Sequence, residues 1–214
     1  MRHPKVHRGR LELLADMLYD VALDVASLGR FGALVRRTVG LMDLCLGDRV
    51  LDMGCGTGRM ACEVLERIGP EGRLLGLDAS PVMVERFRRR CRRFPNTSVK
   101  LARVDLPLPY DGEFDKVIFS FVLHELPKDA RGRALENARR ALRDGGWIVV
   151  LDYNRFLDGM PPTFEFFLSA LEPPCALEFV RWDLVSHLSG IGFGRFVEHT
   201  LVGGYVRLLK ARKP

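Results

Sequence analysis

The sequence of 214 residues lacks a long apolar segment. Its longest stretch without Asp, Glu, Lys or Arg is Leu184–Gly194, eleven residues, whereas a membrane-spanning helix needs about 20 apolar residues. The basic start, Met1–Lys5, is not followed by the apolar run of a secretory signal. These two absences predict a protein without transmembrane segments, and we expect it in the cytoplasm.

Cysteine is sparse and scattered along the chain. The five cysteines include no Cys-x-x-Cys pair; they are Cys45, Cys55, Cys62, Cys91 and Cys175. Reduced thiols in a cytosolic protein are the simplest interpretation of this odd number. A metal site needs a denser cluster of Cys, His and acidic residues, so we expect none.

A general excess of one charge is also missing. The net charge is +6, but Arg86–Arg93 alone holds six arginines, and the remaining 27 Lys and Arg equal the 27 Asp and Glu. Such a local patch can attract phosphates or anionic lipid headgroups, or it can be a solvated helix face. Nucleic-acid binding is therefore not favoured for the whole protein, while peripheral membrane contact stays open.

A regular alternation of short apolar runs and helical segments occupies the middle of the chain. The runs are Val50–Met53, Leu74–Leu77, Val99–Ala102, Lys116–Phe119 and Trp147–Leu151, and the helical segments are Met60–Ile68, Pro81–Phe94 and Lys128–Leu142. Strands alternating with helices favour a parallel sheet covered on both faces. The chain is long enough for one domain with a substantial core.

The two ends depart from this alternation. Two helices are expected before the first strand, over residues 11–28 and 31–44, so we assign residues 1–46 to an N-terminal helical extension or lid and 47–214 to the main domain. Residues 153–174 hold four prolines and five Phe or Tyr without strand periodicity.

The C-terminal part predicts a helix over Trp182–Ser189 and then two strands, over Arg195–Thr200 and Tyr205–Lys210. The Gly203-Gly204 pair between these strands is typical of a hairpin turn. The predicted fold is therefore α/β: a Rossmann-like, doubly wound, mostly parallel seven-stranded sheet with a C-terminal β-hairpin.

The turn after the first strand, Gly54–Gly58, carries three glycines, which let a backbone turn sharply and approach a ligand. Asp78 follows Gly58 by 20 residues and ends the second strand, where nucleotide-binding α/β folds hold a ribose. A dinucleotide fold needs G-x-G-x-x-G, but Arg59 stands at the third glycine position. Asp52 would also repel a pyrophosphate. A ligand with an ammonium, a ribose and no phosphate fits better, and S-adenosylmethionine is such a ligand.

Five motifs in order make the chain resemble the class I S-adenosylmethionine-dependent methyltransferases. Within them it is most similar to the branch that includes the ubiquinone/menaquinone-biosynthesis methyltransferases. The motifs are Asp52–Gly58, Asp78–Met83, Asp105–Asp115, Phe114–Leu126 and Ala141–Leu151. The resemblance implies methyl transfer from S-adenosylmethionine, with S-adenosylhomocysteine as the product. The Asn/Asp-Pro-Pro-aromatic motif of amino-methylating nucleic-acid enzymes is absent after the fourth strand.

The resemblance also implies particular cofactor contacts. Asp52 would hold the methionine ammonium, Asp78 would accept both ribose hydroxyls, and the main chain around Ser120 would complete the ammonium site. Met83 would pack on the adenine and Asp105 would accept its amine. The full expected set, with one tyrosine at the methionine carboxylate, is Tyr19, Asp52, Gly54, Cys55, Gly56, Gly58, Asp78, Ala79, Met83, Asp105, Leu106 and Ser120.

Catalysis of methyl transfer depends mainly on alignment, and a base is needed only if the acceptor must lose a proton. His124, just beyond the fourth strand, is the candidate base, with a positional role as the alternative. Glu125, Asp152 and Tyr153 are weaker candidates at the same edge.

An apolar segment between residues 156 and 168 would suit a small hydrophobic or aromatic, quinone-like acceptor. Its members are Phe156, Leu157, Met160, Pro161, Pro162, Phe164, Phe166, Phe167 and Leu168. Core packing or a dimer contact would explain them equally well. The acceptor atom and the oligomeric state stay open.

Three other functions remain as alternatives. The first is an RNA or protein methyltransferase anchored by Arg86–Arg93, and the second is a non-catalytic S-adenosylmethionine-binding module. The third is a nicotinamide dehydrogenase, for which the glycine spacing is wrong.

Overall fold

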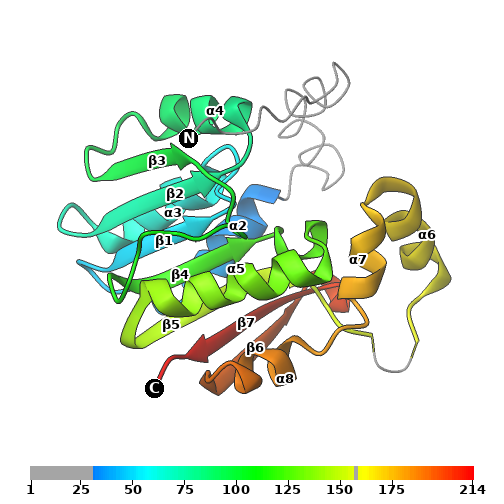
Figure 1. Ribbon diagram of the computed structural model, residues 1–214. Helices are drawn as coiled ribbons and strands as arrows, with labels where there is room; N and C mark the ends of the chain where they lie inside the picture. The colour runs from blue at the N-terminus through cyan, green and yellow to red at the C-terminus, as the bar shows by residue number, and fades with distance from the viewer. Residues whose placement is uncertain (1–30, 157–158) are drawn as a thin grey trace.

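The computed structural model describes residues 31–156 and 159–214, so Tyr19 and the helix expected over 11–28 lie outside the described residues. The strands form one seven-stranded sheet in the order β3-β2-β1-β4-β5-β7-β6 (Figure 1). Their bounds are β1 Arg49–Met53, β2 Arg73–Asp78, β3 Thr97–Leu101, β4 Phe114–Ser120, β5 Leu142–Tyr153, β6 Gly194–Leu201 and β7 Val206–Arg212.

Strands β1 to β5 pair in parallel, while β7 pairs antiparallel with both β5 and β6. The mostly parallel seven-stranded sheet with a C-terminal hairpin is therefore confirmed, and the sheet is mixed because of its last two strands. A short 3₁₀ turn, η2 Val202–Gly204, joins β6 to β7 at the expected glycine pair.

The helices are α2 Phe31–Gly40, α3 Arg59–Ile68, α4 Pro81–Cys91, α5 Lys128–Ala141, α6 Pro162–Leu171, α7 Pro174–Phe179 and α8 Leu184–Gly190, with a 3₁₀ turn, η1, at Leu123–Glu125. Helix α2 ends before Leu44 and α4 before Phe94, so both are shorter than the sequence predicts. In the part of the chain that the structure describes, no helix is long and apolar enough to cross a membrane.

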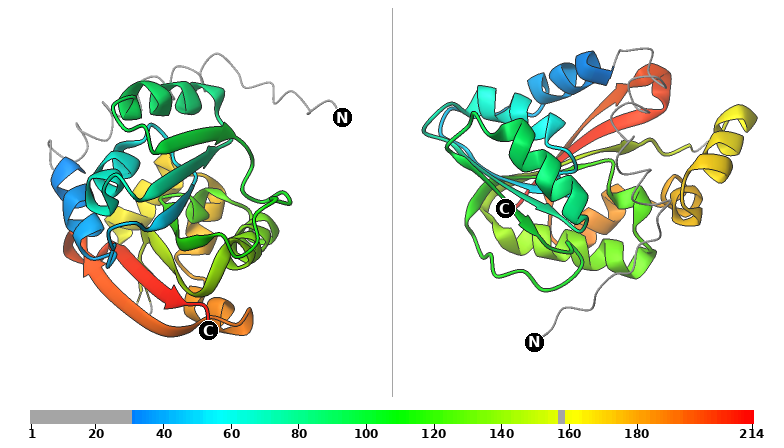
Figure 2. Two further views of the ribbon diagram at one scale, coloured as in Figure 1. Left: turned by 90° about the vertical axis from the view of Figure 1, so that its left-hand side faces the viewer. Right: turned by 90° about the horizontal axis from the view of Figure 1, so that it is seen from above.

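Two apolar cores lie on opposite faces of the sheet. Alternate residues of β1 point to opposite faces, so Val50 joins the core under α2, α3 and α4, while Leu51 joins the core under α5, α7 and α8. Figure 2 shows α2 and α3 on one side of the sheet and α5 on the other. This two-sided cover confirms the doubly wound architecture.

Helix α2 packs against α3, and its Val35 and Val39 belong to the same core as Val64. Residues 31–40 therefore share the core of the sheet domain. The assignment of residues 1–46 to a separate extension or lid stays a prediction.

Helices α6 and α7, which the pattern of strands and helices does not predict, lie beyond the carboxyl ends of the parallel strands (Figure 1). Each begins with a proline pair that fills the N-cap and the first helical position, Pro161-Pro162 in α6 and Pro173-Pro174 in α7. Proline is well tolerated there because the first helical N–H has no intrahelical partner. In this segment the prolines start helices and do not break them.

Replacing Phe87 with alanine should destabilise the fold by roughly 3–5 kcal/mol, because the side chain is 1% exposed and its loss leaves a cavity. The matched control is Phe166→Ala, since Phe166 is 72% exposed and should change stability by no more than about 0.5 kcal/mol. Urea unfolding of both variants measures the difference. Equal stabilities would contradict the packing described for α4.

Candidate active site

Three of the expected cofactor residues lie at the carboxyl ends of adjacent strands. Asp52 lies in β1, Asp78 ends β2 and Ser120 ends β4, and β1 lies between the other two strands. The chain reverses its direction of winding at β1, and ligands of open α/β sheets bind at such a switch point. The topology therefore brings these residues to one edge.

The glycine turn between β1 and α3 has a backbone that side chains would disturb. Gly54 has φ +84°, and a Cβ on it would lie 2.3 Å from Cγ2 of Val122. Gly58 has φ +82°, and its Cβ would lie 2.9 Å from Cδ2 of Phe87. At Gly56 the corresponding position meets no described atom within 4 Å. The turn is therefore tightly packed on two glycines and open at the third.

Asp78 fixes the shape of this turn. Its Oδ2 accepts a hydrogen bond from the Gly56 N–H at 2.8 Å, and its Oδ1 accepts one from the Ser80 N–H at 2.8 Å. The carboxylate thus joins the end of β2 to the glycine turn, next to the start of α4.

Asp52 is the least satisfied charged group of the site. The residue is 1% exposed, and neither carboxylate oxygen has a hydrogen-bond partner among the described residues. Burial, with the nearby charge of Asp78, raises the pKa of Asp52 to about 7. An unpaired buried carboxylate is costly, and a cation bound beside it would remove that cost.

Asp105 lies in the loop after β3 and is already paired. Arg103 donates to both of its oxygens, at 3.0 and 2.9 Å, and Arg133 donates to Oδ2 at 3.3 Å. The hydrogen bond from Arg103 lowers the pKa of Asp105, although burial opposes it. The expected contact with an adenine amine stays a prediction. In that contact the carboxylate would accept from the amine as well as from two arginines.

The other expected cofactor residues take varied positions around the turn. Cys55 is buried, and its N–H donates to the Leu77 carbonyl at 2.9 Å. Met83 is buried in the first turn of α4. Ala79 and Leu106 are exposed.

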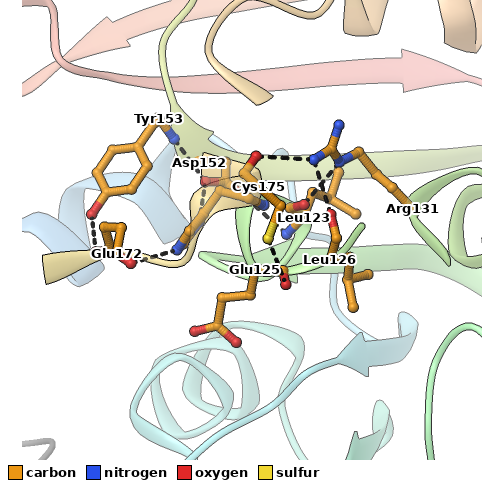
Figure 3. A network of polar contacts seen from close by, with 9 residues as sticks. Leu123, Glu125, Leu126, Arg131, Asp152, Tyr153, Glu172 and Cys175 are labelled. Carbon is orange, nitrogen blue, oxygen red and sulfur yellow. Dashed lines mark hydrogen bonds and ion pairs between the residues drawn. The ribbon is translucent and has the colours of Figure 1, made fainter. Parts of the chain in front are cut away.

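A second cluster surrounds His124 in η1, directly after β4. Asp152 of β5 is fully buried, and its Oδ2 accepts the N–H groups of Leu123 and His124, at 3.0 and 3.3 Å. Its Oδ1 accepts the Tyr153 N–H at 2.8 Å and lies 2.7 Å from Nδ1 of His124 (Figure 3). Asp152 therefore fixes both the backbone of η1 and the orientation of the His124 ring.

Glu172, which follows α6, completes this cluster, although it belongs to none of the sequence motifs. Its Oε2 lies 3.3 Å from Nε2 of His124, and its Oε1 accepts a hydrogen bond from the Tyr153 hydroxyl at 2.6 Å. Glu172 is 48 residues beyond His124 in a segment without predicted structure. No local pattern could have revealed this contact.

The charges of the cluster favour a protonated His124. Burial alone would lower the pKa of His124, but the charge of Asp152 and the hydrogen bonds to Asp152 and Glu172 outweigh it and raise the pKa to about 10. An imidazolium donates from both nitrogens and cannot accept a proton. The geometry therefore favours the positional alternative for His124, and its role as a base stays a prediction.

Glu125 differs from His124 because the residue is exposed, and its side chain points away from the rest of the network (Figure 3). Even so, desolvation by the surrounding protein raises the pKa of Glu125 to about 7; His124 opposes this effect, and the charges of Glu172, Asp152 and Asp78 add to it. A carboxylate with this pKa exchanges its proton near neutral pH.

Aromatic rings surround Tyr153, next to the His124 cluster. The Tyr153 ring lies 4.7 Å from that of His124 and 5.6 Å from that of Phe164, and Phe121 lies edge-on to Tyr153 at 5.9 Å. Phe164 stacks in turn on Phe167 at 5.9 Å. The end of β4, the end of β5 and α6 thus contribute to one aromatic wall.

Arg131 of α5 ties η1 to α7. Its fully buried guanidinium donates to the carbonyls of Leu123 and Cys175, at 3.0 and 3.3 Å, and lies over the rings of Phe179 and Trp182. Figure 3 shows the hydrogen bonds from Arg131 to the Leu123 and Cys175 carbonyls. Helix α7 is therefore anchored to η1, the turn that carries His124.

Comparison with known proteins agrees with this geometry. Residues 50–146 match the family model described as a methyltransferase domain. An uncharacterized methyltransferase from Synechocystis sp. is 31% identical over 167 residues, which cover 78% of this chain and 76% of that protein. The chain belongs to the class I S-adenosylmethionine-dependent methyltransferases.

Two further comparisons describe its place among methyltransferases. The demethylmenaquinone methyltransferase of Tropheryma whipplei is 32% identical over 66% of this chain, and the match spans little more than half of that relative, 56%. The putative methyltransferase solved with the Haloferax volcanii Trm112 activator has a TM-score of 0.70 at 17% identity, covering 93% of this chain and 97% of that one. The second comparison shows the fold, and the first comes from the quinone branch that the sequence resembles.

The residues of this methyltransferase domain fit the cofactor of the family, S-adenosylmethionine. The unpartnered Asp52 carboxylate suits the ammonium of its methionine part. The open position at Gly56 leaves room for a ligand beside the backbone. An anion in place of the ammonium would be repelled by both Asp52 and Asp78.

Replacing Glu172 with Gln should lower the pKa of His124 from about 10 toward its ordinary 6.5, because one of its two carboxylates is lost. A raised histidine pKa stabilises the fold fully below pH 6.5, and this stabilisation is lost as pH rises through the folded pKa. The variant should therefore lose it at a lower pH than the wild type. An NMR titration of labelled histidines, with urea unfolding across the same pH range, measures both effects.

Tyr153→Phe serves as the matched control, since it removes a hydrogen bond to Glu172 but keeps both carboxylates. Its His124 should remain protonated at neutral pH. An unchanged titration midpoint in Glu172→Gln would contradict the proposed contact.

Proposed function

We propose that the protein transfers a methyl group from S-adenosylmethionine to a small hydrophobic or aromatic, quinone-like acceptor. The observation that carries this proposal is the buried, unpartnered carboxylate of Asp52 beside an open glycine turn. This arrangement suits a cationic nucleoside and disfavours a diphosphate, so it argues against a nicotinamide dehydrogenase.

When bound, S-adenosylmethionine supplies an electrophilic methyl group on a sulfonium. Asp52 holds the ammonium, helped by the main chain at Ser120, and Asp78 accepts the ribose hydroxyls while it keeps the glycine turn in shape. Met83 and Asp105 contact the adenine. Tyr19 lies outside the described residues, and its contact with the methionine carboxylate is expected from the family resemblance alone.

The acceptor binds against the aromatic wall of Phe121, Tyr153 and Phe164, beneath α6. Flat apolar rings favour an aromatic partner through offset and edge-on contacts. A relative named demethylmenaquinone methyltransferase supports the quinone-like class. Alignment of the acceptor with the methyl group is the main contribution of this wall to the rate.

A proton leaving the acceptor passes to a carboxylate in this proposal. Glu125, an exposed carboxylate of η1 with a raised pKa, is the candidate acceptor of this proton. His124, held between Asp152 and Glu172, acts in its protonated form and orients Glu172 and Tyr153. The catalytic role of His124 is thus positioning, and its ring would act as a base only after it lost a proton.

The basic segment Arg86–Arg93 gives little support to the RNA alternative. Arg88 and Arg89 pair with Glu85, and Arg93 pairs with Glu66. The segment also lies at α4, near β2 and β3, while α6 and α7 lie beyond β5 (Figure 1). Two glutamates therefore offset part of its charge, and the segment lies away from the aromatic wall.

Asp52→Asn should stabilise the free protein yet weaken its binding to S-adenosylhomocysteine. Because burial raises the pKa of Asp52 from 3.8 to about 7, the folded state holds this proton more tightly than the unfolded state does. The resulting stability is fully present below pH 3.8 and is lost as pH rises through about 7. Removing the charge should therefore add roughly 1–3 kcal/mol of stability at about pH 8. The same change should weaken binding by about tenfold or more, measured by calorimetry.

Asp144→Ala is the matched control, because this aspartate has an 88% exposed side chain. It should leave both the stability and the affinity close to the wild type. An Asp52→Asn protein that binds S-adenosylhomocysteine as tightly as the wild type would contradict the assignment.

Incubation with S-adenosylmethionine and a panel of hydroquinones, simple phenols, RNA and protein should identify the acceptor class. We expect S-adenosylhomocysteine and a methylated aromatic product, detected by mass spectrometry. Phe164→Ala should raise the KM for the aromatic acceptor, while Phe166→Ala, at an exposed position of the same helix, should not. Methylation of RNA or protein alone would favour that alternative, and no turnover with any acceptor would favour a binding module.

A further inference from the structure

Two cysteines from neighbouring helices have their sulfur atoms in contact. Cys62 lies in α3 and Cys91 ends α4, and their Sγ atoms are 3.2 Å apart in the reduced state. A disulfide has an S–S distance of about 2.05 Å. The two sulfurs therefore need to approach by little more than 1 Å to form the bond.

The two thiols differ in their surroundings. Cys62 is half-buried, whereas Cys91 is 1% exposed. The hydrogen bond from Cys91 lowers the pKa of the Cys62 thiol; burial opposes this effect, and the charges of Arg90 and Arg93 support it. Cys62 is thus the more accessible thiol and the one that more readily becomes a thiolate, the reactive form of cysteine. Cys91 lies next to it as the second thiol.

Both cysteines contact Gly58, the last glycine of the cofactor turn. The Cys62 N–H donates to the Gly58 carbonyl at 3.0 Å, and Sγ of Cys91 lies 3.7 Å from the same oxygen. A Cβ on Gly58 would lie 3.0 Å from Sγ of Cys91. The Cys91 sulfur therefore packs directly on Gly58, and its movement toward Cys62 would change this contact.

We propose that Cys62 and Cys91 form a reversible disulfide on reaction with hydrogen peroxide, and that this bond weakens cofactor binding by shifting Gly58. The Cys62 thiolate attacks one peroxide oxygen, breaks the O–O bond and becomes a sulfenic acid, with release of hydroxide. The Cys91 sulfur then attacks the Cys62 sulfur, and the displaced hydroxide leaves as water with the thiol proton. Two thiols are oxidised and one peroxide is reduced to two waters. A thiol reductant reverses the step.

Mass spectrometry of the full-length protein tests the bond itself. After treatment with hydrogen peroxide and alkylation of the remaining thiols, the protein should carry three alkyl groups, whereas the reduced protein carries five. Apart from these groups, its mass should be lower by two hydrogens. Trypsin should release peptide 60–67 joined to dipeptide 91–92, because arginines flank both. Dithiothreitol should separate them. Oxidation that stops at sulfinic or sulfonic acid on Cys62, or that joins other cysteines, would overturn the proposal.

Calorimetry with S-adenosylhomocysteine tests the consequence, which rests on the proposed function. The oxidised wild type should bind about tenfold more weakly than the reduced form, the effect of losing one or two backbone hydrogen bonds. Cys62→Ser and Cys91→Ser should bind equally before and after peroxide. Cys45→Ser, which removes an exposed cysteine outside the pair, should behave as the wild type.

An oxidised protein that contains the bond but binds with unchanged affinity would overturn the link to Gly58. Failure of the reduced wild type to bind S-adenosylhomocysteine would instead contradict the proposed function. The peptide measurement still tests the disulfide in that case, because it requires no ligand.

Discussion

A buried carboxylate without a partner in the described structure, that of Asp52, is the constraint on which the rest of the site depends. A folded protein normally pairs such a group or neutralises it, since its desolvation is expensive. Here burial at the carboxyl end of β1, together with the nearby charge of Asp78, raises the pKa of this carboxyl to about 7. The free protein thus carries a cost that a cationic ligand relieves, and binding energy gained this way is specific for positive charge.

The second half of the site depends on contacts between distant segments. Asp152 receives four donors and sets the geometry of η1, while Glu172 and Arg131 join that loop to α6 and α7. The ring of His124 is consequently held by β5 on one side and by the covering helices on the other. A change in the position of α6 would move Glu172 and so alter the charge and orientation of His124.

Local patterns predicted much of this structure. Glycines that adopt positive φ, such as Gly58, and apolar runs, such as β1, can be recognised locally in the sequence, so the sheet and its hairpin were predictable. Helices α6 and α7 were not, because a proline pair resembles a breaker until its place at a helix start is known. The protonation of His124 depends on Glu172, a contact that only the tertiary structure makes.

The pKa of the Asp52 carboxyl, followed by ¹³C NMR with and without S-adenosylhomocysteine, tests the central claim most directly. The account predicts titration near pH 7 in the free protein and a clear fall in the complex, because an ammonium beside the carboxylate favours its charged form. A midpoint that S-adenosylhomocysteine leaves unchanged, although it binds, would contradict the claim that Asp52 holds the amino group.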